Sequence, residues 1–283
     1  MQIDMTDARD PELRKAVLVP LAAHNAEMTG RTDDYVTLAI VLCDAEGRIE
    51  GGMFGGLFYG WLKIELAYLP EHRRGERLGA RMLAALEAAA IARGAIGVWM
   101  TTYSFQAPGF YQKQGYREVG GLVDFPPGFS NVYLIKTDGF GTETGFDIIE
   151  NAPDDVRQAI RSLIRDYSDG FSGPGFWRDL SLLVRDDSSA IIGGLWGRSG
   201  RGWLFIDLLG LPKSLRHERL GSRLMDMAEA EARARGCIGV YLDTFSFQAR
   251  PFYEKRGFTV FAEIPDYLLG HRRYFLSKRL DTP

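Results

Sequence analysis

The spacing of apolar side chains predicts a half-buried helix near the start of each half of the chain. In 154–167, apolar residues recur every three or four positions, which is the period of a helix with one face in a core. The matching segment 11–24 contains Pro20, and a proline inside a helix removes a hydrogen bond and kinks or ends it. We therefore expect a regular helix over 154–167 and a kinked or shortened one over 11–24.

Short apolar, β-rich runs follow each of these helices and predict strands. One long segment per half, 76–93 and 218–235, is instead rich in residues of high helix propensity, and Gly94 and Gly236 follow where a helix C-cap belongs. The expected strands lie at 36–43, 50–58, 61–69, 96–100, 116–123 and 132–136, and at 180–185, 191–198, 203–211, 238–242, 258–264 and 274–278. Strands mixed with helices in this way indicate an α/β (α+β) fold.

The same pattern occurs twice. Residues 51–116 align with 193–258 without a gap, at a constant offset of 142, and roughly half of the positions are identical. A repeat of this length matches two whole domains of ordinary size, and a chain of 283 residues fits two. The stretch between the copies is rich in Gly and Thr and has no hydrophobic period. We predict an N-terminal domain at 1–138, a linker at 139–146 and a C-terminal domain at 147–283.

Composition narrows the class of protein. A hydrophobic share of 46% and a charged share of 25% are typical of soluble globular proteins. The net charge of −3 argues against broad nucleic-acid binding, which needs a basic face. No apolar run reaches a membrane span, and the acidic start shows no signal peptide. The two cysteines and four histidines have neither disulfide nor metal-ligand spacing. We expect a cytoplasmic protein without metal, membrane or nucleic-acid partner.

A basic, glycine-bearing turn joins a strand to each long helix, within 69–83 and 211–225. The first turn of a helix has unpaired N–H donors and a positive dipole end, so it can hold phosphate oxygens. Arg74 or Arg216 would add charge-assisted bonds, and Gly79 or Gly221 would let the backbone approach a diphosphate closely. The alternative is a plain strand–helix connection with a solvated basic turn.

Two motifs in each half resemble those of the GCN5-related N-acetyltransferase (GNAT) superfamily. The first is Arg/Gln-x-x-Gly-x-Gly/Ala at the start of the long helix; here Arg74 and Gly79 match it, whereas Arg77 and Arg219 stand where the first glycine is usual. The second, Asn-x-x-Ala-x-x-x-Tyr-x-Lys-x-Gly-Phe, is matched by 104–116 and 246–258, with serine in place of the asparagine. The resemblance covers nearly all of both halves.

This resemblance implies two tandem GNAT-like domains, each with a mixed, mainly antiparallel central sheet flanked by helices. It implies acetyl-CoA in a V-shaped opening between the strand before the turn and the strand after the long helix, with the pantetheine arm along the former strand. The cofactor-binding residues expected from it are Leu69, Arg74, Gly75, Glu76, Arg77, Leu78, Gly79, Ala80 and Ser104, and Leu211, Arg216, His217, Glu218, Arg219, Leu220, Gly221, Ser222 and Ser246.

Acyl transfer to an amine needs a base, an oxyanion donor and a proton for the leaving thiolate. Glu65 and Asp207 are matched carboxylates inside apolar strands, where a charge is costly unless paired or used. The alternative is an acid that faces solvent or an arginine. A strand N–H near 66–67 or 208–209 could serve as the oxyanion donor. Tyr111 and Tyr253 match the family's general-acid tyrosine; the alternative is a packed aromatic side chain.

Four other residues are candidates for substrate binding. Asp243 and His271 occur only in the second copy and could shape an amine pocket, or each could close a local hydrogen bond. Trp61 and Trp203 are kept in both copies and would pack in a core or form a substrate wall.

The sequence therefore predicts an enzyme that transfers an acetyl group from acetyl-CoA to a primary amine of a small molecule by direct attack. A non-catalytic acyl-CoA-binding or regulatory protein and a ligand-free structural duplicate are the alternatives. Gly75 of the first copy is replaced by His217 in the second, which leaves open which half is active. The halves could form a pseudo-dimer within a monomer, or the chain could form a homodimer.

Overall fold

A computed structural model describes residues 2–7, 10–31, 35–215, 219–268 and 270–280. The first part of the chain contains β1 (Gln2–Thr6), α1 (Pro11–Thr29), β2 (Val36–Cys43), β3 (Ile49–Phe58), β4 (Trp61–Tyr68), α2 (Leu78–Ile91), β5 (Gly97–Tyr103), α3 (Pro108–Lys113), β6 (Arg117–Val123) and β7 (Ser130–Lys136). The second contains β8 (Ile149–Glu150), α4 (Asp154–Ser172), β9 (Arg178–Arg185), β10 (Ile191–Gly200), β11 (Trp203–Gly210), α5 (Leu220–Ala234), β12 (Gly239–Phe245), α6 (Arg250–Glu254), β13 (Thr259–Leu268) and β14 (His271–Arg279).

The expected strands are confirmed, and two details of the helices differ from expectation. Helix α1 continues through Pro20 to Thr29, because its packing on β10 and β11 supports a helix that propensity alone would not. Helices α2 and α5 begin at Leu78 and Leu220, two residues later than expected. The C-cap glycines are confirmed by the positive φ of Gly94 and Gly236.

All described strands form one sheet in the order β1-β9-β10-β11-β12-β14-β13-β6-β7-β5-β4-β3-β2-β8. Only the β4–β5 and β11–β12 pairings are parallel among those the structure describes, so the sheet is mixed and mainly antiparallel, as expected. Helix α2 packs on one face of the first half of the sheet and α4 on the other, because alternate residues of β2 join different clusters, Leu38 and Ile40 with α2 and Ala39 with α4.

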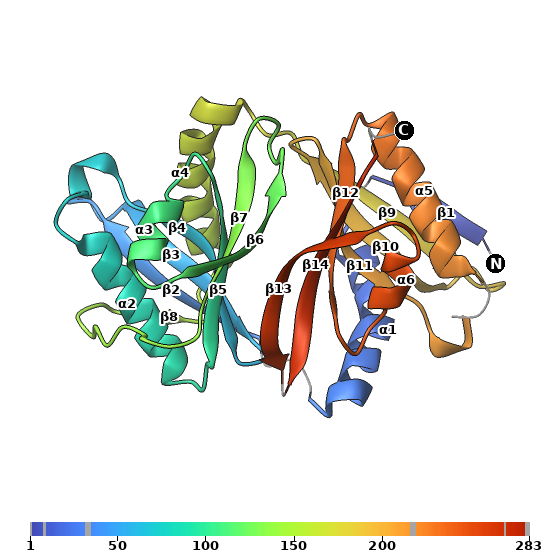
Figure 1. Cartoon of the computed structure of the whole chain (residues 1–283), viewed down its shortest axis with the longest axis horizontal. Helices are drawn as coiled ribbons and strands as arrows, with labels where there is room; N and C mark the ends of the chain where they lie inside the picture. Colours follow the sequence, from blue (N-terminus) through green and yellow to red (C-terminus); the bar gives the residue numbers. More distant parts are fainter. Residues whose placement is uncertain (1, 8–9, 32–34, 216–218, 269, 281–283) are drawn as a thin grey trace.

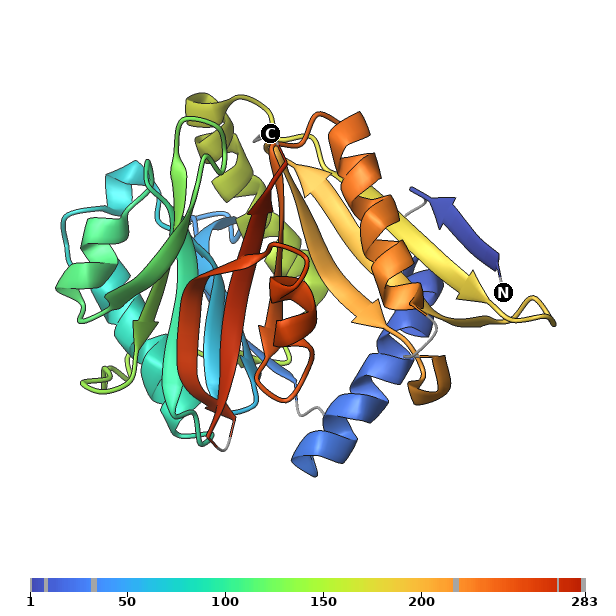
Figure 2. The same ribbon diagram turned by 45° about the vertical axis from the view of Figure 1, so that its right-hand side comes forward.

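The first strand and helix of each half are exchanged. Strand β1 pairs with β9, and α1 packs on β10 and β11 of the second half. Strand β8 pairs with β2, and α4 packs on β3 and β4 of the first half (Figure 1). Figure 2 shows the blue N-terminal strand and helix beside the yellow and orange strands of the second half. The boundaries at 138 and 146 stay a prediction about the sequence repeat, whereas the packing in space crosses them.

The halves meet through β6 and β13, which pair at Gly120 and Ala262. A Cβ atom at Gly120 would lie 1.9 Å from the Phe261 carbonyl oxygen, so only glycine permits this approach. Trp61 donates its indole N–H to the Asp266 carbonyl (3.1 Å), and Trp203 donates to the Asp124 carbonyl (2.9 Å). These donors and acceptors are 142 residues apart in the repeat, so the joint has approximate two-fold symmetry.

Candidate active site

A gap opens in the sheet at the same place in each half. Strands β4 and β5 are paired from Trp61 and Gly97 to Ile64 and Met100, and the ladder then stops. Strands β11 and β12 stop at the equivalent pair. Backbone groups of β4 beyond Ile64 that face the gap therefore have no ladder partner in β5, and the expected V-shaped opening has a physical basis here.

Each matched carboxylate lies on a β-bulge at the edge of its gap. In the β3–β4 ladder, Phe54 opposes Leu66 while Gly55 opposes Ile64, so Glu65 is the extra residue. The β10–β11 ladder shifts in the same way, and Asp207 is the extra residue there. A bulge bends the strand and re-aims a side chain. The two carboxylates thus leave the regular alternation of their strands.

A cavity of about 50 Å³ lies in the first gap. Its walls include Glu65, Tyr111 and the strand segment 66–67, which are the predicted base, general acid and oxyanion donor of one acyl transfer. Its lining residues are Ile64, Glu65, Leu66, Ala67, Met100, Thr101, Thr102, Gln106, Tyr111 and Ile164. Gln106 and Ile164 were missed; the retention of Gln106 in both copies was the available signal, whereas nothing in the sequence linked α4 to this half.

Glu65 is ion-paired. Arg157 of α4 donates to one carboxylate oxygen from Nη2 (2.7 Å) and Nε (3.2 Å), and the Tyr35 hydroxyl donates to the other (3.3 Å). Burial disfavours the charge, but Lys63 and Arg157 outweigh it and hold the pKa of the Glu65 carboxyl below its usual value. The desolvated phenol beside this carboxylate has its pKa raised to about 12. Glu65 is therefore ionised at neutral pH and faces an arginine.

Asp207 has the equivalent arrangement in the second half. Arg14 of α1 donates to one of its carboxylate oxygens from Nη2 (2.9 Å) and Nε (3.2 Å). The Asp207 side chain is 35% exposed, compared with 16% for Glu65, so water screens this pair more strongly.

Tyr111 and Tyr253 occupy equivalent buried positions. Each contacts the preceding phenylalanine edge-on, with ring centres 5.0 Å and 5.1 Å apart. Burial raises the pKa of both phenols above 10, because an ionised phenolate would lose its hydration. Both stay protonated at neutral pH, as a proton donor requires.

The turn before α2 can hold an anion. Arg77 has a left-handed backbone (φ 59°), as does Arg219 before α5 (φ 56°), which explains why glycine is usual at this position in the resembled motif. The first intrahelical bond here runs from the Arg81 N–H to the Arg77 carbonyl (3.0 Å), so the N–H groups of 78–80 precede the helical ladder. Arg216, His217 and Glu218 lie outside the described residues.

Gly79 and Gly221 are not required by the protein's own packing. A Cβ at Gly79 would lie 3.5 Å from Leu69 and 3.6 Å from Phe110, and one at Gly221 would lie 3.6 Å from Phe252. These are ordinary contacts. The packing of the described residues therefore gives no reason for glycine at either position. The Arg74 side chain turns back and donates to the Leu69 carbonyl (3.1 Å).

Several candidates have local structural contacts instead. The Ser104 hydroxyl accepts the Ser130 N–H, and the Ser246 hydroxyl accepts the Arg272 N–H, both at 3.1 Å. These serines thus tie β5 to the start of β7 and β12 to β14. His271 lies 3.0 Å from the Ser246 hydroxyl, which is the local hydrogen bond that the sequence left as an alternative.

The remaining substrate candidates are also engaged. Arg273 donates to Asp243 (2.9 Å) and to Tyr267 (2.9 Å), which is the local hydrogen bond that the sequence left as an alternative for Asp243. Trp61 and Trp203 are each 1% exposed and lie in the joint between the halves. Both tryptophans therefore have the packing role that the sequence offered as the alternative to a substrate wall.

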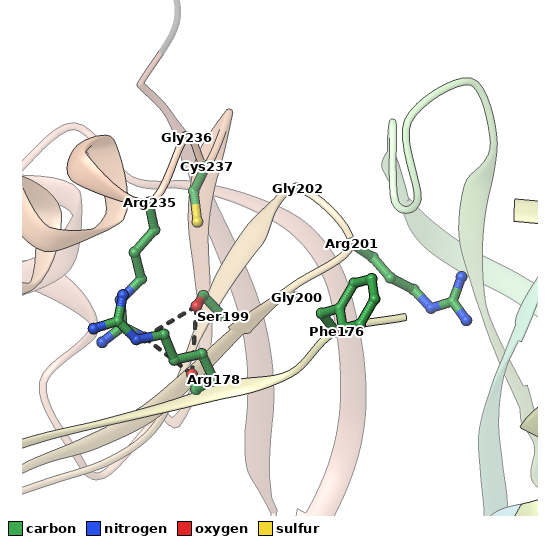
Figure 3. A pocket seen from close by; sticks show the side chains of 9 residues that line it. All are labelled: Phe176, Arg178, Ser199, Gly200, Arg201, Gly202, Arg235, Gly236 and Cys237. Atoms are coloured by element: carbon green, nitrogen blue, oxygen red, sulfur yellow. Dashed lines mark hydrogen bonds between the residues drawn. The ribbon is translucent and has the colours of Figure 1, made fainter. Parts of the chain in front are cut away.

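A larger hollow of about 330 Å³ lies at the opposite end of β10 and β11 (Figure 3). It is basic, but its arginines have protein partners. Arg235 donates to Glu231, to two backbone carbonyls and to Ser199. Arg201 contacts Ser172 and Asp169, and Arg178 contacts Asp7. The hollow lacks a carboxylate–tyrosine pair, so the gap between β4 and β5 is the better candidate.

The described part of the chain was also compared with what a metal site and a membrane-spanning helix require. No group of three or more His, Cys, Asp or Glu side chains there could hold a metal ion. No helix among the described residues has the length and apolar character that crossing a bilayer requires.

Comparison with known proteins finds acetyltransferases among the relatives of this chain. The acetyltransferase (GNAT) family model matches residues 155–258. Acetyltransferase Atu2258 of Agrobacterium fabrum (strain C58 / ATCC 33970) is 36% identical over 134 residues, which are 47% of this chain and 98% of the relative. Blasticidin-S acetyltransferase of Streptomyces morookaense is 37% identical over 134 residues, 47% of this chain and 92% of the relative.

A solved structure of an acetyltransferase from Bacillus cereus ATCC 14579 is 33% identical and matches 47% of this chain and 96% of its own, with a TM-score of 0.43. Each relative is thus matched almost end to end by about half of this chain.

Proposed function

The chain belongs to the acetyltransferase (GNAT) family, and from this premise we propose that it transfers an acetyl group from acetyl-CoA to a primary amine of a small molecule. The amine attacks the thioester directly, and no acyl-enzyme forms. Acetyl-CoA supplies the activated acyl group in this family. The relative that acetylates blasticidin S, by its name, supports a small-molecule acceptor.

The observation that carries the proposal is the cavity between β4 and β5. It is lined by a carboxylate, a buried tyrosine and strand backbone outside the parallel ladder. The second half has the same strand separation, bulged carboxylate and buried tyrosine.

The donor's diphosphate fits the turn that precedes α2. The N–H groups of 78–80, the left-handed Arg77 and the sterically optional Gly79 form a cradle for phosphate oxygens. The pantetheine arm would lie along β4 beyond Ile64. Backbone N–H groups of 66–67 would donate to the acyl oxygen in the gap.

Glu65 acts on the acceptor amine. Its lowered pKa makes it a weaker base than an ordinary glutamate, so its first task is to hold the amine as an ammonium ion. The proton then leaves through the carboxylate or through water, and the neutral amine attacks. Asp207 would do the same in the second half.

Tyr111 and Tyr253 provide the proton for the leaving thiolate. A thiol of pKa about 8.5 is a weaker acid than protonated carboxyls but a stronger acid than a buried phenol. The transfer therefore accompanies cleavage of the C–S bond, and the phenolate that it leaves is reprotonated through water by the proton that the amine releases.

The test is turnover of acetyl-CoA with a panel of amines that includes blasticidin S, measured as free CoA released. Changing both Tyr111→Phe and Tyr253→Phe should lower kcat by about 10²–10⁴-fold, the range of a lost general acid. Affinity for CoA should remain. A double variant with wild-type turnover contradicts the acid role.

A non-catalytic acyl-CoA-binding protein is the second candidate. The pairing of both carboxylates with arginines favours it, because a paired carboxylate is less available to an amine. Calorimetry with CoA followed by the amine panel separates the two functions. Tight CoA binding with no turnover on any amine supports this candidate.

A further inference from the structure

The helix beside each candidate site comes from the opposite half of the chain. Ile164 of α4 lines the cavity between β4 and β5, and Arg157 of the same helix binds Glu65. In the second half, Arg14 of α1 binds Asp207. Arg14 and Arg157 occupy equivalent positions in their helices, so the same contact is made twice across the halves.

Both helices are held close to the sheet. Val17 of α1 and Ile160 of α4 are equivalent, and both are fully buried. A Cβ at Gly210 would lie 2.3 Å from the Val17 carbonyl oxygen, and one at Gly52 would lie 2.8 Å from Ile160 Cδ1. A larger residue at Gly210 would push α1 outward and lengthen the Arg14–Asp207 contact, whereas one at Gly52 would first meet the Ile40 carbonyl oxygen of β2 at 2.5 Å.

The retained glutamine of the second motif also reaches the exchanged helix. Gln106 accepts hydrogen bonds from the Thr102 hydroxyl and the Tyr103 N–H, and its amide donates to Ser168 of α4 (3.3 Å). Gln248 accepts equivalent bonds from Thr244 and the Phe245 N–H.

Gln248 then donates to Asn25 of α1 (2.8 Å). A residue kept in both copies thus connects the loop after the site strand to a helix of the other half. Two independent contacts per site, an arginine and a glutamine, follow the same crossed pattern.

We propose that each acyl-transfer site is composite, with Arg157 positioning Glu65 and Arg14 positioning Asp207 across the two halves. One half supplies the carboxylate, the tyrosine and the diphosphate turn, and the other half supplies the helix that fixes the carboxylate's direction. The inference rests on the proposed function. It assigns the arginines a positioning task, because they touch the carboxylate and not the reacting atoms.

The charges around Glu65 set the direction of the expected effect. Lys63 of its own strand, Arg157 and Arg161 of α4 and the Tyr35 hydroxyl face this carboxylate. Removing the Arg157 guanidinium takes away one positive charge and both directional hydrogen bonds. Glu65 then titrates at higher pH, and the acid limb of kcat/KM at this site moves upward.

The experiment uses the full chain with one site silenced at a time. With Tyr253→Phe the first-half site reports, and with Tyr111→Phe the second-half site reports. Arg157→Met should lower kcat/KM about tenfold or more in the first background, the change expected for a lost charge-assisted hydrogen bond, and leave the second unchanged. Arg14→Met should show the reverse. Arg157→Lys should restore part of the loss.

Arg165→Met is the matched control, since Arg165 lies on α4 but is exposed and contacts only neighbours in the helix; it should change neither site. A loss that follows the arginine's own half, or that is equal in both backgrounds, overturns the proposal.

A readout independent of turnover is carboxyl NMR of Glu65. Its titration should move to higher pH in Arg157→Met and not in Arg14→Met. If the wild-type chain acetylates no amine, the proposed function fails, and this titration still decides the positioning role. A Glu65 titration unmoved by Arg157→Met overturns it.

Discussion

The two candidate sites share a backbone frame and differ in how their carboxylates are paired and exposed. Both have a parallel ladder that stops, a bulged carboxylate, a left-handed residue before the long helix and a buried tyrosine. Among the described residues, Glu65 has two partners and little exposure, whereas Asp207 has one and is exposed. The second half also has the Asp243–Arg273 pair, where the first has Thr101.

This difference shows which features the duplication has preserved. The backbone features that form the gap and the turn are the same in both halves, because a small change in any of them would close the opening. The carboxylates of the proposed acceptor side have diverged, because a carboxylate of different length or exposure still fits the same frame. We therefore expect the halves to bind the same acyl donor and to differ in the acceptor amines they accept.

The largest effect on turnover should come from replacing each of the two tyrosines alone. If both sites turn over, Tyr111→Phe and Tyr253→Phe should each remove one share of the activity, and the two shares should differ between amines. If one half is inactive, one variant should lose about 10²–10⁴-fold and the other nothing. The measurement is kcat/KM for each variant on two amines of different charge. Equal losses on every amine would contradict the expected difference between the halves.

A smaller effect should follow from a methyl group in the diphosphate turns. Gly79→Ala and Gly221→Ala should weaken CoA binding at their own site by about tenfold or more, the scale of one charge-assisted bond lost to phosphate. Each should also raise the free energy of unfolding by up to about 1 kcal/mol, because alanine favours a helix more than glycine does.

Calorimetry with CoA and thermal unfolding measure these two quantities on the same samples. Gly109→Ala is the control, because a Cβ there has no atom within 4 Å and lies outside the turn. Unchanged CoA affinity in both turn variants would mean that the turns do not hold the diphosphate.

A further effect, on stability and not on activity, should come from the two ion pairs. Glu65→Gln should lower the free energy of unfolding at neutral pH by about 1–3 kcal/mol, because it leaves the charge of Arg157 with a poorer partner. Asp207→Asn should lower it by less than about 1 kcal/mol, because that pair is more exposed.

The pH dependence of this effect has a definite sign. The folded pKa of Glu65 is lowered, so its contribution is present above the unfolded pKa and is lost as the pH falls through the folded pKa. Urea unfolding at neutral and acid pH should show the gap between Glu65→Gln and wild type closing in acid. A gap that widens in acid would contradict the ion-pair assignment.

Local pattern accounted for most elements of the fold. The strands of both halves, the long helices and their terminal glycines follow from period, propensity and glycine conformation, which act over a few residues. Strand β1 was missed, although the alternation of Ile3 and Met5 with polar residues was a strand signal. Strand β8 has only two residues, too few for a pattern.

The candidate site was predicted in part. The repeat identified Glu65 and Tyr111, and the structure places them in one cavity. Ser104, Ser246 and the two tryptophans have structural contacts that would also keep them in both copies, since a strand link and a joint between halves constrain a residue as strongly as a ligand does. Retention in a repeat shows that a residue is constrained and not what constrains it.

Local sequence pattern specifies two equivalent halves of one sheet, their glycine turns and the residue types at each gap, because these depend on local geometry and on residues close in the chain. The half of the sheet that each first helix covers is set by tertiary contacts alone. Helices α1 and α4 bury equivalent residues, Val17 and Ile160, and carry equivalent arginines, and the two halves of the sheet offer them similar surfaces. A helical period specifies which face of a helix is buried but not which of two equivalent surfaces buries it. In this chain each first helix packs on the strands of the other half.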